Sequence, residues 1–230
     1  ALAVDDNGNI FVGYGNGTHS YAKVSRLTSS GRLVWTEDLG VTSGTIFGLS
    51  KGAEGNLYAT GPTYSDLNGV SKTGNAAGYI IKLDGNGDKL WTKLANSDGW
   101  VEPKTIKSAS DGTLYISGTL WKGSLDGKSS SVGTDVFISK YNSDGGRLWT
   151  SVLKGNGSED ASGIAEGNDG SIYLTGDTGG ALFDGQQAYY SNSYFLTKFE
   201  QGGASYALST SNSSLNEGTI LTTTGSTSNV

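Results

Sequence analysis

One five-residue pattern occurs four times in this 230-residue chain and constrains its fold more than any other feature. The pattern is a glycine, any residue, Ile or Leu, Phe or Tyr, and then an aliphatic residue. Its leading glycines follow one another at intervals of 47, 57 and 58 residues: Gly8, Gly55, Gly112 and Gly170. A repeat of this length indicates one supersecondary unit stacked on copies of itself, because a single unit cannot bury its own apolar face.

A second line of residues follows each copy of the first. It begins with glycine and ends, four residues later, in an aromatic residue, at intervals of 56, 58 and 57 residues: Trp35, Trp91, Trp149 and Tyr206. Between the two lines, each copy carries a lysine that we interpret as one matching position: Lys23, Lys82, Lys140 and Lys198. The first copy lacks a longer loop that the others have, which accounts for its shorter interval.

Each repeat contains the signals of four short strands. In the third copy, β-branched and aromatic runs cover 105–109, 113–118, 135–141 and 147–153. Glycine-containing turns separate them, and Asn142-Ser-Asp-Gly-Gly146 has the Asp-Gly signal of a hairpin. The 37 glycines and 2 prolines of the chain suit many strands joined by tight turns. No run of 10 to 12 residues has a helical apolar period.

These features predict an all-β fold, a β-propeller of four-stranded antiparallel blades. Four blades lie in this chain, and we expect them to be part of a larger propeller, because an unclosed ring would expose an apolar face at each end. The predicted propeller spans 1–208, with blades at about 1–43, 44–100, 101–158 and 159–208. Residues 209–230 are rich in Ser and Thr and are predicted to be a tail or the start of a following module.

The repeat resembles the SBBP family, which is named for its seven-bladed β-propeller. The resemblance rests on Asp169-Gly-Ser-Ile-Tyr-Leu-Thr-Gly176, Asp135-Val-Phe-Ile-Ser-Lys140 and Gly146-Arg-Leu-Trp-Thr150, and covers about residues 1–208. The second line also looks like the tryptophan motif of PQQ-type propellers. This likeness implies a framework role in which the rings pack between blades and the indole N–H binds backbone, for Trp35, Trp91, Trp149 and, in the weaker fourth copy, Tyr206.

Composition excludes several classes of function. The net charge of −6 and the pI near 4.7 argue against a nucleic-acid partner. The chain has no cysteine, so disulfides and thiolate metal sites are excluded, and it has no apolar run long enough for membrane insertion. It begins with Ala rather than Met and has no signal peptide. We therefore expect a processed product or a piece of a longer parent chain, whose other domains are its partners.

The sequence offers few candidates for chemistry. The only histidine, His19, lies in a loop, and no catalytic triad can be assembled around it, so we predict that the chain is not an enzyme. No cofactor is predicted, with calcium the one possibility. Its weak candidate ligands are the turn residues Asp84, Asn86 and Asp88, and the pair Glu102 and Asp160, which precede the first strands of two repeats. The alternatives are an ordinary hairpin turn and the capping of turn amides.

Two tryptophans fall outside the repeated lines. Trp100 lies in a connection between repeats and Trp121 at the start of a long loop, so both are candidates for ligand or partner contacts, with packing on the blade edge as the alternative. Function is expected where the copies differ, around these residues, His19 and 183–190. We predict a non-catalytic structural or adhesive module of a secreted or cell-surface bacterial protein that binds protein or glycan through its loops. The alternatives are a fragment of a quinoprotein-type or hydrolytic propeller enzyme whose active site lies outside these blades, and an architectural spacer in a surface layer or filament.

Overall fold

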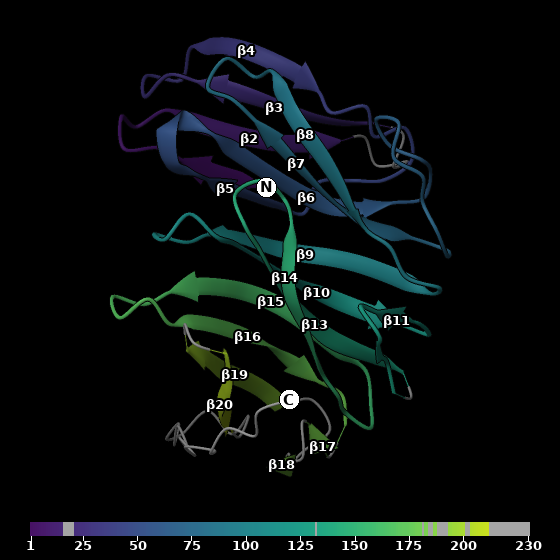
Figure 1. Ribbon diagram of the computed structural model, residues 1–230. Coiled ribbons are helices and arrows are strands. Elements are labelled where there is room, and N and C mark those ends of the chain that lie inside the picture. Colours follow the sequence, from purple (N-terminus) through teal and green to yellow (C-terminus); the bar gives the residue numbers. More distant parts are fainter. Residues whose placement is uncertain are drawn as a thin grey trace.

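The fold consists of four antiparallel sheets of four strands each, one for each repeat (Figure 1). The computed structural model describes residues 1–15, 21–131, 133–180, 182–183, 186–187, 193–200 and 203–211. Within these ranges the only helix is a single 3₁₀ turn, Ala53–Gly55, and no helix is long and apolar enough to span a membrane. The all-β class and the four-stranded blades are confirmed.

In each sheet the order of the four strands follows the chain. Sheet 1 contains β1 (Leu2–Val4), β2 (Ile10–Gly15), β3 (Ala22–Leu27) and β4 (Leu33–Asp38). Sheet 2 contains β5 (Gly48–Lys51), β6 (Leu57–Thr63), β7 (Ala77–Leu83) and β8 (Lys89–Ala95). Sheet 3 contains β9 (Trp100–Ser108), β10 (Leu114–Trp121), β13 (Thr134–Tyr141) and β14 (Arg147–Leu153). Sheet 4 contains β15 (Glu159–Glu166), β16 (Ile172–Thr178), β19 (Ser193–Glu200) and β20 (Gly203–Ser211).

The sheets are arranged as successive blades of a propeller. The first strands of neighbouring sheets contact each other in sequence, β1 with β5, β5 with β9, and β9 with β15. Figure 1 shows the sheets fanned from β2–β4 at the top to β19 and β20 at the bottom, so sheets 1 and 4 lie at opposite ends. Over the described residues the four blades therefore form an open arc, as expected for part of a larger ring.

One apolar core fills each interface between neighbouring sheets. Between sheets 1 and 2, Phe11 and Val24 pack against Leu57 and Leu83. The other two interfaces repeat this arrangement, with Tyr58 against Leu114 between sheets 2 and 3, and Tyr115 against Ile172 and Phe199 between sheets 3 and 4. Sheets 2 and 3 thus each have one face that receives the preceding blade and one that covers the following blade.

The loop that the first repeat lacks folds into a small hairpin in the others. In sheet 3 it forms β11 (Ser124–Leu125) and β12 (Lys128–Ser129), and the two turn residues Asp126 and Gly127 have positive φ. Such a two-residue turn matches the twist of the strands it joins. In sheet 4 the same loop forms β17 (Leu182–Phe183) and β18 (Gln186–Gln187).

Three side chains on adjacent strands recur on the covering face of the sheets. A ring on the second strand lies opposite a cation on the third, and the cation lies opposite a tryptophan on the fourth. In sheet 1 the cation is Arg26 rather than the expected Lys23, because the register pairs Arg26 with both Phe11 and Trp35. The cation lies over the ring of the second strand in every sheet: Arg26 over Phe11, Lys82 over Tyr58, Lys140 over Tyr115 and Lys198 over Tyr173.

The three framework tryptophans lie at the sheet interfaces. Trp35 donates its indole N–H to the Gly85 carbonyl of sheet 2 at 3.2 Å, and Trp149 stacks on Phe199 of sheet 4. The Trp91 Nε1 is buried with no hydrogen-bond partner among the described residues. In sheet 4 the backbone register places Tyr206 opposite Phe199, and Ala207 takes the place opposite Lys198 that tryptophan holds elsewhere.

Candidate functional site

Three half-buried aromatic side chains meet where sheets 2 and 3 adjoin. Tyr64 follows β6, Trp100 begins β9, and Trp121 ends β10 directly opposite Trp100. The ring centroids of Trp100 and Trp121 are 5.4 Å apart, and that of Tyr64 is 6.2 Å from Trp100 in an edge-on arrangement. The two tryptophans that lie outside the repeated lines therefore contact each other, and a tyrosine that sequence reasoning missed extends the group.

A signal for Tyr64 was present in the sequence. Tyr64 lies nine residues after the leading glycine Gly55, and Trp121 lies nine residues after Gly112. The two rings thus occupy one position of the repeat, at the end of the second strand. Successive sheets bring this position to the same side of the molecule, so an aromatic residue in both copies predicts the contact.

Glu102 lies beside this aromatic group. It stands two residues after Trp100 on β9, so the two side chains share one face of the strand. Its carboxylate accepts a hydrogen bond from the Tyr64 hydroxyl at 3.3 Å and pairs with the Lys104 ammonium at 3.3 Å. The Lys104 ammonium also lies 4.8 Å from the ring centroid of Phe47 on sheet 2. The predicted residue Glu102 is therefore held from two sides in a polar contact between blades.

Asp160 joins the same surface from sheet 4. Its carboxylate accepts a 2.6 Å hydrogen bond from the hydroxyl of Thr119 on β10, and Thr119 lies directly opposite Glu102 in the strand register. Thr119 thus lies between Glu102 and Asp160, the two carboxylates that the sequence analysis paired. We call this surface, to which sheets 2, 3 and 4 contribute, the rim cluster. Its members are Tyr64, Trp100, Glu102, Trp121 and Asp160.

The electrostatics of the rim cluster follow from burial and from neighbouring carboxylates. Burial raises the pKa of Tyr64, and the Glu102 charge and hydrogen bond raise it further, so the hydroxyl stays a donor. Asp177 lies opposite Asp160 on the neighbouring strand β16. Burial and the nearby Asp160 charge raise the pKa of Asp177 above its ordinary value. The site offers aromatic surface beside hydrogen-bond acceptors.

The other metal candidates lie in a hairpin turn. The Asp84 carboxylate accepts the backbone N–H groups of Asn86 and Asp88, at 2.8 and 2.9 Å, which is the geometry of a side chain that closes a turn. In the part of the chain that the structure describes, no three His, Cys, Asp or Glu residues group to hold a metal ion. Calcium binding stays a prediction, and His19 and most of 183–190 lie outside the described residues.

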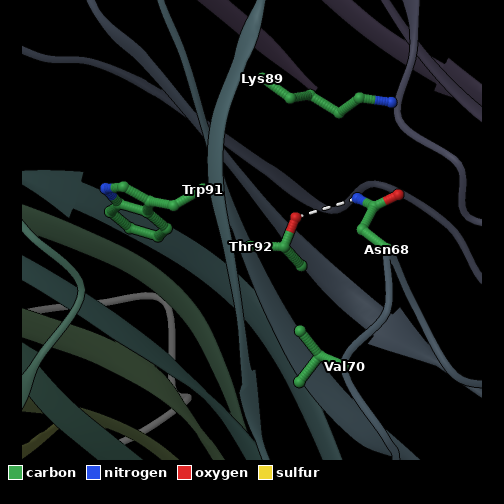
Figure 2. A pocket seen from close by; sticks show the side chains of 5 residues that line it. All are labelled: Asn68, Val70, Lys89, Trp91 and Thr92. Carbon is green, nitrogen blue, oxygen red and sulfur yellow. Dashed lines mark hydrogen bonds between the residues drawn. The ribbon is translucent and has the colours of Figure 1, made fainter.

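A separate hollow lies on the second repeat, and its polar groups other than the Trp91 indole already have partners. It measures about 280 Å³ and is lined by Asn68, Val70, Lys89, Trp91 and Thr92 (Figure 2). Asn68 donates to the Thr92 hydroxyl at 2.9 Å, and the Lys89 ammonium donates to the Asp38 carbonyl and pairs with Glu37. Figure 2 shows the Trp91 indole on the far side of its strand from Asn68. We therefore assign no ligand to this hollow.

The chain is similar in sequence to a curated protein and in architecture to solved structures. No family model matches the chain, so the resemblance to the SBBP repeat stays a prediction. The regulatory protein FlaEY of Caulobacter vibrioides is 24% identical over 159 residues, which cover 64% of this chain and 17% of that protein. A solved structure of a GH43_12 protein retrieved from capybara gut metagenome covers 86% of this chain and 38% of that chain, with 11% identity and a TM-score of 0.48.

The second comparison corrects one prediction from the sequence. We predicted that the chain is not an enzyme, and the similar structure is a GH43 glycoside hydrolase, a propeller enzyme family. The prediction rested on the lack of a histidine-based catalytic set, and glycoside hydrolysis needs only two carboxylates. In a chain with 22 Asp and Glu residues, that lack excludes nothing.

Proposed function

We propose that this chain is a glycan-binding β-propeller module and that the rim cluster contacts the glycan. The observation that carries the proposal is the contact between Trp100 and Trp121, which places two half-buried indoles and Tyr64 beside Glu102 and Asp160. Sugar rings have apolar C–H faces that pack on aromatic rings, and hydroxyl edges that donate to carboxylates. A site that combines both kinds of group suits this ligand class.

The carboxylates at the Asp160 end of the rim cluster favour a neutral or basic sugar over an acidic one. Glu102 is already paired with Lys104, whereas Asp160 and Asp177 face each other without a cation between them in the strand register. An anionic ligand would bring further negative charge next to these carboxyl groups. A hydroxyl-rich neutral ligand would instead donate hydrogen bonds to these carboxylates.

The test is a binding measurement on the full chain. Neutral oligosaccharides of glucose, xylose and galactose, and matched uronic-acid oligomers, are titrated while tryptophan fluorescence is followed. We expect a neutral oligosaccharide to bind, and Trp100→Ala and Trp121→Ala each to weaken binding at least tenfold. Leu148→Ala is the control, because Leu148 is exposed on the outer strand β14, away from the rim cluster.

Binding that survives both tryptophan substitutions would contradict the proposal. So would binding that Leu148→Ala weakens equally, because the loss would then reflect general destabilisation. Circular dichroism of each variant shows whether the fold is kept.

A second candidate function, glycoside hydrolysis, is favoured by the pair Asp160 and Asp177. The two residues are opposite each other on β15 and β16, and the pKa of Asp177 is raised by burial and by the Asp160 charge. A carboxyl whose pKa is raised by burial and by a second carboxyl beside it is the arrangement that supplies a general acid and its partner. The same oligosaccharides, incubated with the chain and analysed for reducing ends, test this function.

If hydrolysis occurs here, Asp160→Asn and Asp177→Asn each abolish it, and oligosaccharide binding persists in Asp177→Asn, which lies outside the rim cluster. Asp144→Asn, in the exposed turn before β14, is the matched control and should leave the rate unchanged. Activity that persists in both the Asp160 and the Asp177 variant would place any catalysis elsewhere.

A further inference from the structure

The face of sheet 1 that points away from sheet 2 has the side chains of a receiving face, but no sheet of the described residues lies against it. In sheets 2, 3 and 4 the residues at one position of the second strand are fully buried under the preceding sheet: Leu57, Leu114 and Ile172. The equivalent residue of sheet 1, two residues after the leading glycine, is Ile10, which is partly exposed. Leu2 and Tyr14 on the same face are 64% and 41% exposed.

The third strand repeats this comparison. The residues directly after the third-strand cation in sheets 2, 3 and 4 are all buried: Leu83, Tyr141 and Phe199. The equivalent residue in sheet 1 is Leu27, which is only partly buried. The outward face of sheet 1 therefore has apolar residues at the same positions as the three faces that a preceding blade covers.

The turn before β4 supplies an independent observation. In sheets 2 and 3 the turn glycine lies against the tryptophan of the preceding blade, since a Cβ on Gly87 would lie 3.1 Å from the Trp35 ring and one on Gly145 would lie 3.2 Å from the Trp91 ring. The equivalent glycine of sheet 1, Gly31, also has positive φ, and apart from its chain neighbours no atom of the described residues lies within 4 Å of such a Cβ. The turn of sheet 1 thus has the backbone conformation that contacts an indole in sheets 2 and 3, but no indole of the described residues lies against it.

We propose that this face of sheet 1 receives a further blade of the same repeat, one that carries the fourth-strand tryptophan and belongs to the same polypeptide. The blade would cover Ile10, Val12 and Leu27 and place its indole against Gly31. All three occupied interfaces join consecutive repeats of one chain, and this one continues their series. Apolar faces of this kind are covered in soluble proteins because their exposure to water is unfavourable.

Sheet 4 of a second copy fits this face less well. Its outer face has the Tyr173–Lys198 contact of a covering face, but the residue opposite Lys198 is Ala207, so no indole stands at the position that would meet Gly31. This difference favours a tryptophan-bearing blade over head-to-tail association of two copies.

The test adds such a blade to the full chain. A second copy of residues 101–163 is joined directly to Leu2, so that Gly163 is followed by Leu2 as it is naturally followed by its equivalent, Ile164. The chain has no cysteine, so Val12→Cys gives a single thiol on the receiving face, and its rate of labelling by a maleimide reports coverage. Leu90→Cys, exposed on the outer strand β8, is the control.

We expect the added blade to slow the labelling of Cys at position 12 at least tenfold and to leave the control position unchanged. Replacing the tryptophan of the added copy, Trp149→Ala, should restore much of the rate. Unchanged labelling in the fused chain overturns the proposal, whether the added segment stays unfolded or folds elsewhere. Equal protection by the Trp149→Ala fusion overturns the role of the indole. A dimer of the unfused chain that Val12→Lys dissociates would assign the face to a second copy instead.

Discussion

The indole N–H of Trp35 donates to the carbonyl of Gly85 across the interface between sheets 1 and 2, at 3.2 Å. The same carbonyl accepts the Arg26 guanidinium at 2.9 Å. Two side chains of one repeated face thus bind one turn of the next blade. The following interface keeps the cation contact, Lys82 to the Ser143 carbonyl at 3.4 Å, whereas the Trp91 indole has no acceptor among the described residues.

This difference predicts unequal effects of two matched substitutions. Trp35→Phe and Trp91→Phe both replace an indole by a smaller phenyl ring, but only Trp35→Phe also removes a hydrogen bond. We expect Trp35→Phe to lower the free energy of unfolding by about 1 kcal/mol more than Trp91→Phe, measured by urea denaturation. Equal losses would mean that the Trp35 hydrogen bond adds nothing to stability.

The turn glycines Gly87 and Gly31 allow a second comparison. Both have positive φ, so replacement by alanine is strained at either position, by about 1 to 2 kcal/mol. Only at Gly87 would the added methyl also meet the Trp35 ring. Gly87→Ala should therefore destabilise the chain more than Gly31→Ala, by at least about 1 kcal/mol in urea denaturation. The reverse order would contradict the contact between blades.

Asp169 should titrate far below an ordinary aspartate. The Lys198 ammonium, 2.9 Å away, and the Ser171 backbone N–H lower the pKa of Asp169 from 3.8 to about 2. Its contribution to stability is present above its ordinary pKa and is lost as the pH falls towards 2. In an NMR titration, Lys198→Gln should move the pKa of Asp169 back towards 3.8. A value that stays near 2 in this variant would assign the shift to Ser171 alone.

Glu159 should show the opposite dependence. Its side chain is buried with one carboxylate oxygen, Oε2, lacking a partner among the described residues. Burial and the nearby Asp135 charge raise its pKa, although Thr178 and Gly157 donate to the other oxygen. Because the folded state favours the protonated form, stability is lost as the pH rises through the pKa of the folded state. Glu159→Gln should therefore raise the melting temperature, relative to wild type, more at pH 8 than at pH 4.

Glu166→Gln is the control for that measurement, because the pKa of Glu166 is lowered where that of Glu159 is raised. Although burial works against it, hydrogen bonds from Ser110 and the Lys107 charge lower the pKa of Glu166. The stabilising contribution of Glu166 is present at pH 8 and is lost on acidification below its ordinary pKa. The variant should therefore lose more stability at pH 8 than at low pH. The same pH trend in both variants would contradict these assignments.

The candidate site could be predicted only in part. Trp100 and Trp121 were singled out because they break the repeat, and Glu102 and Asp160 because they share a repeat position. Tyr64 and Thr119 were missed, although they join these residues into one surface. Their contacts link different blades, and the order of residues along one blade does not reveal them.

The sequence by itself determined the strands and their order. Neighbouring strands of a blade are joined by short turns, and local alternation together with glycine at positive φ is enough to specify a hairpin. Tertiary structure decided what depends on register and on packing between blades. The strand register pairs Arg26, not Lys23, with Trp35, and Lys23 lies opposite Asp38. Position in the arc buries Leu57 but leaves Ile10 partly exposed, because burial depends on whether another blade lies against the face.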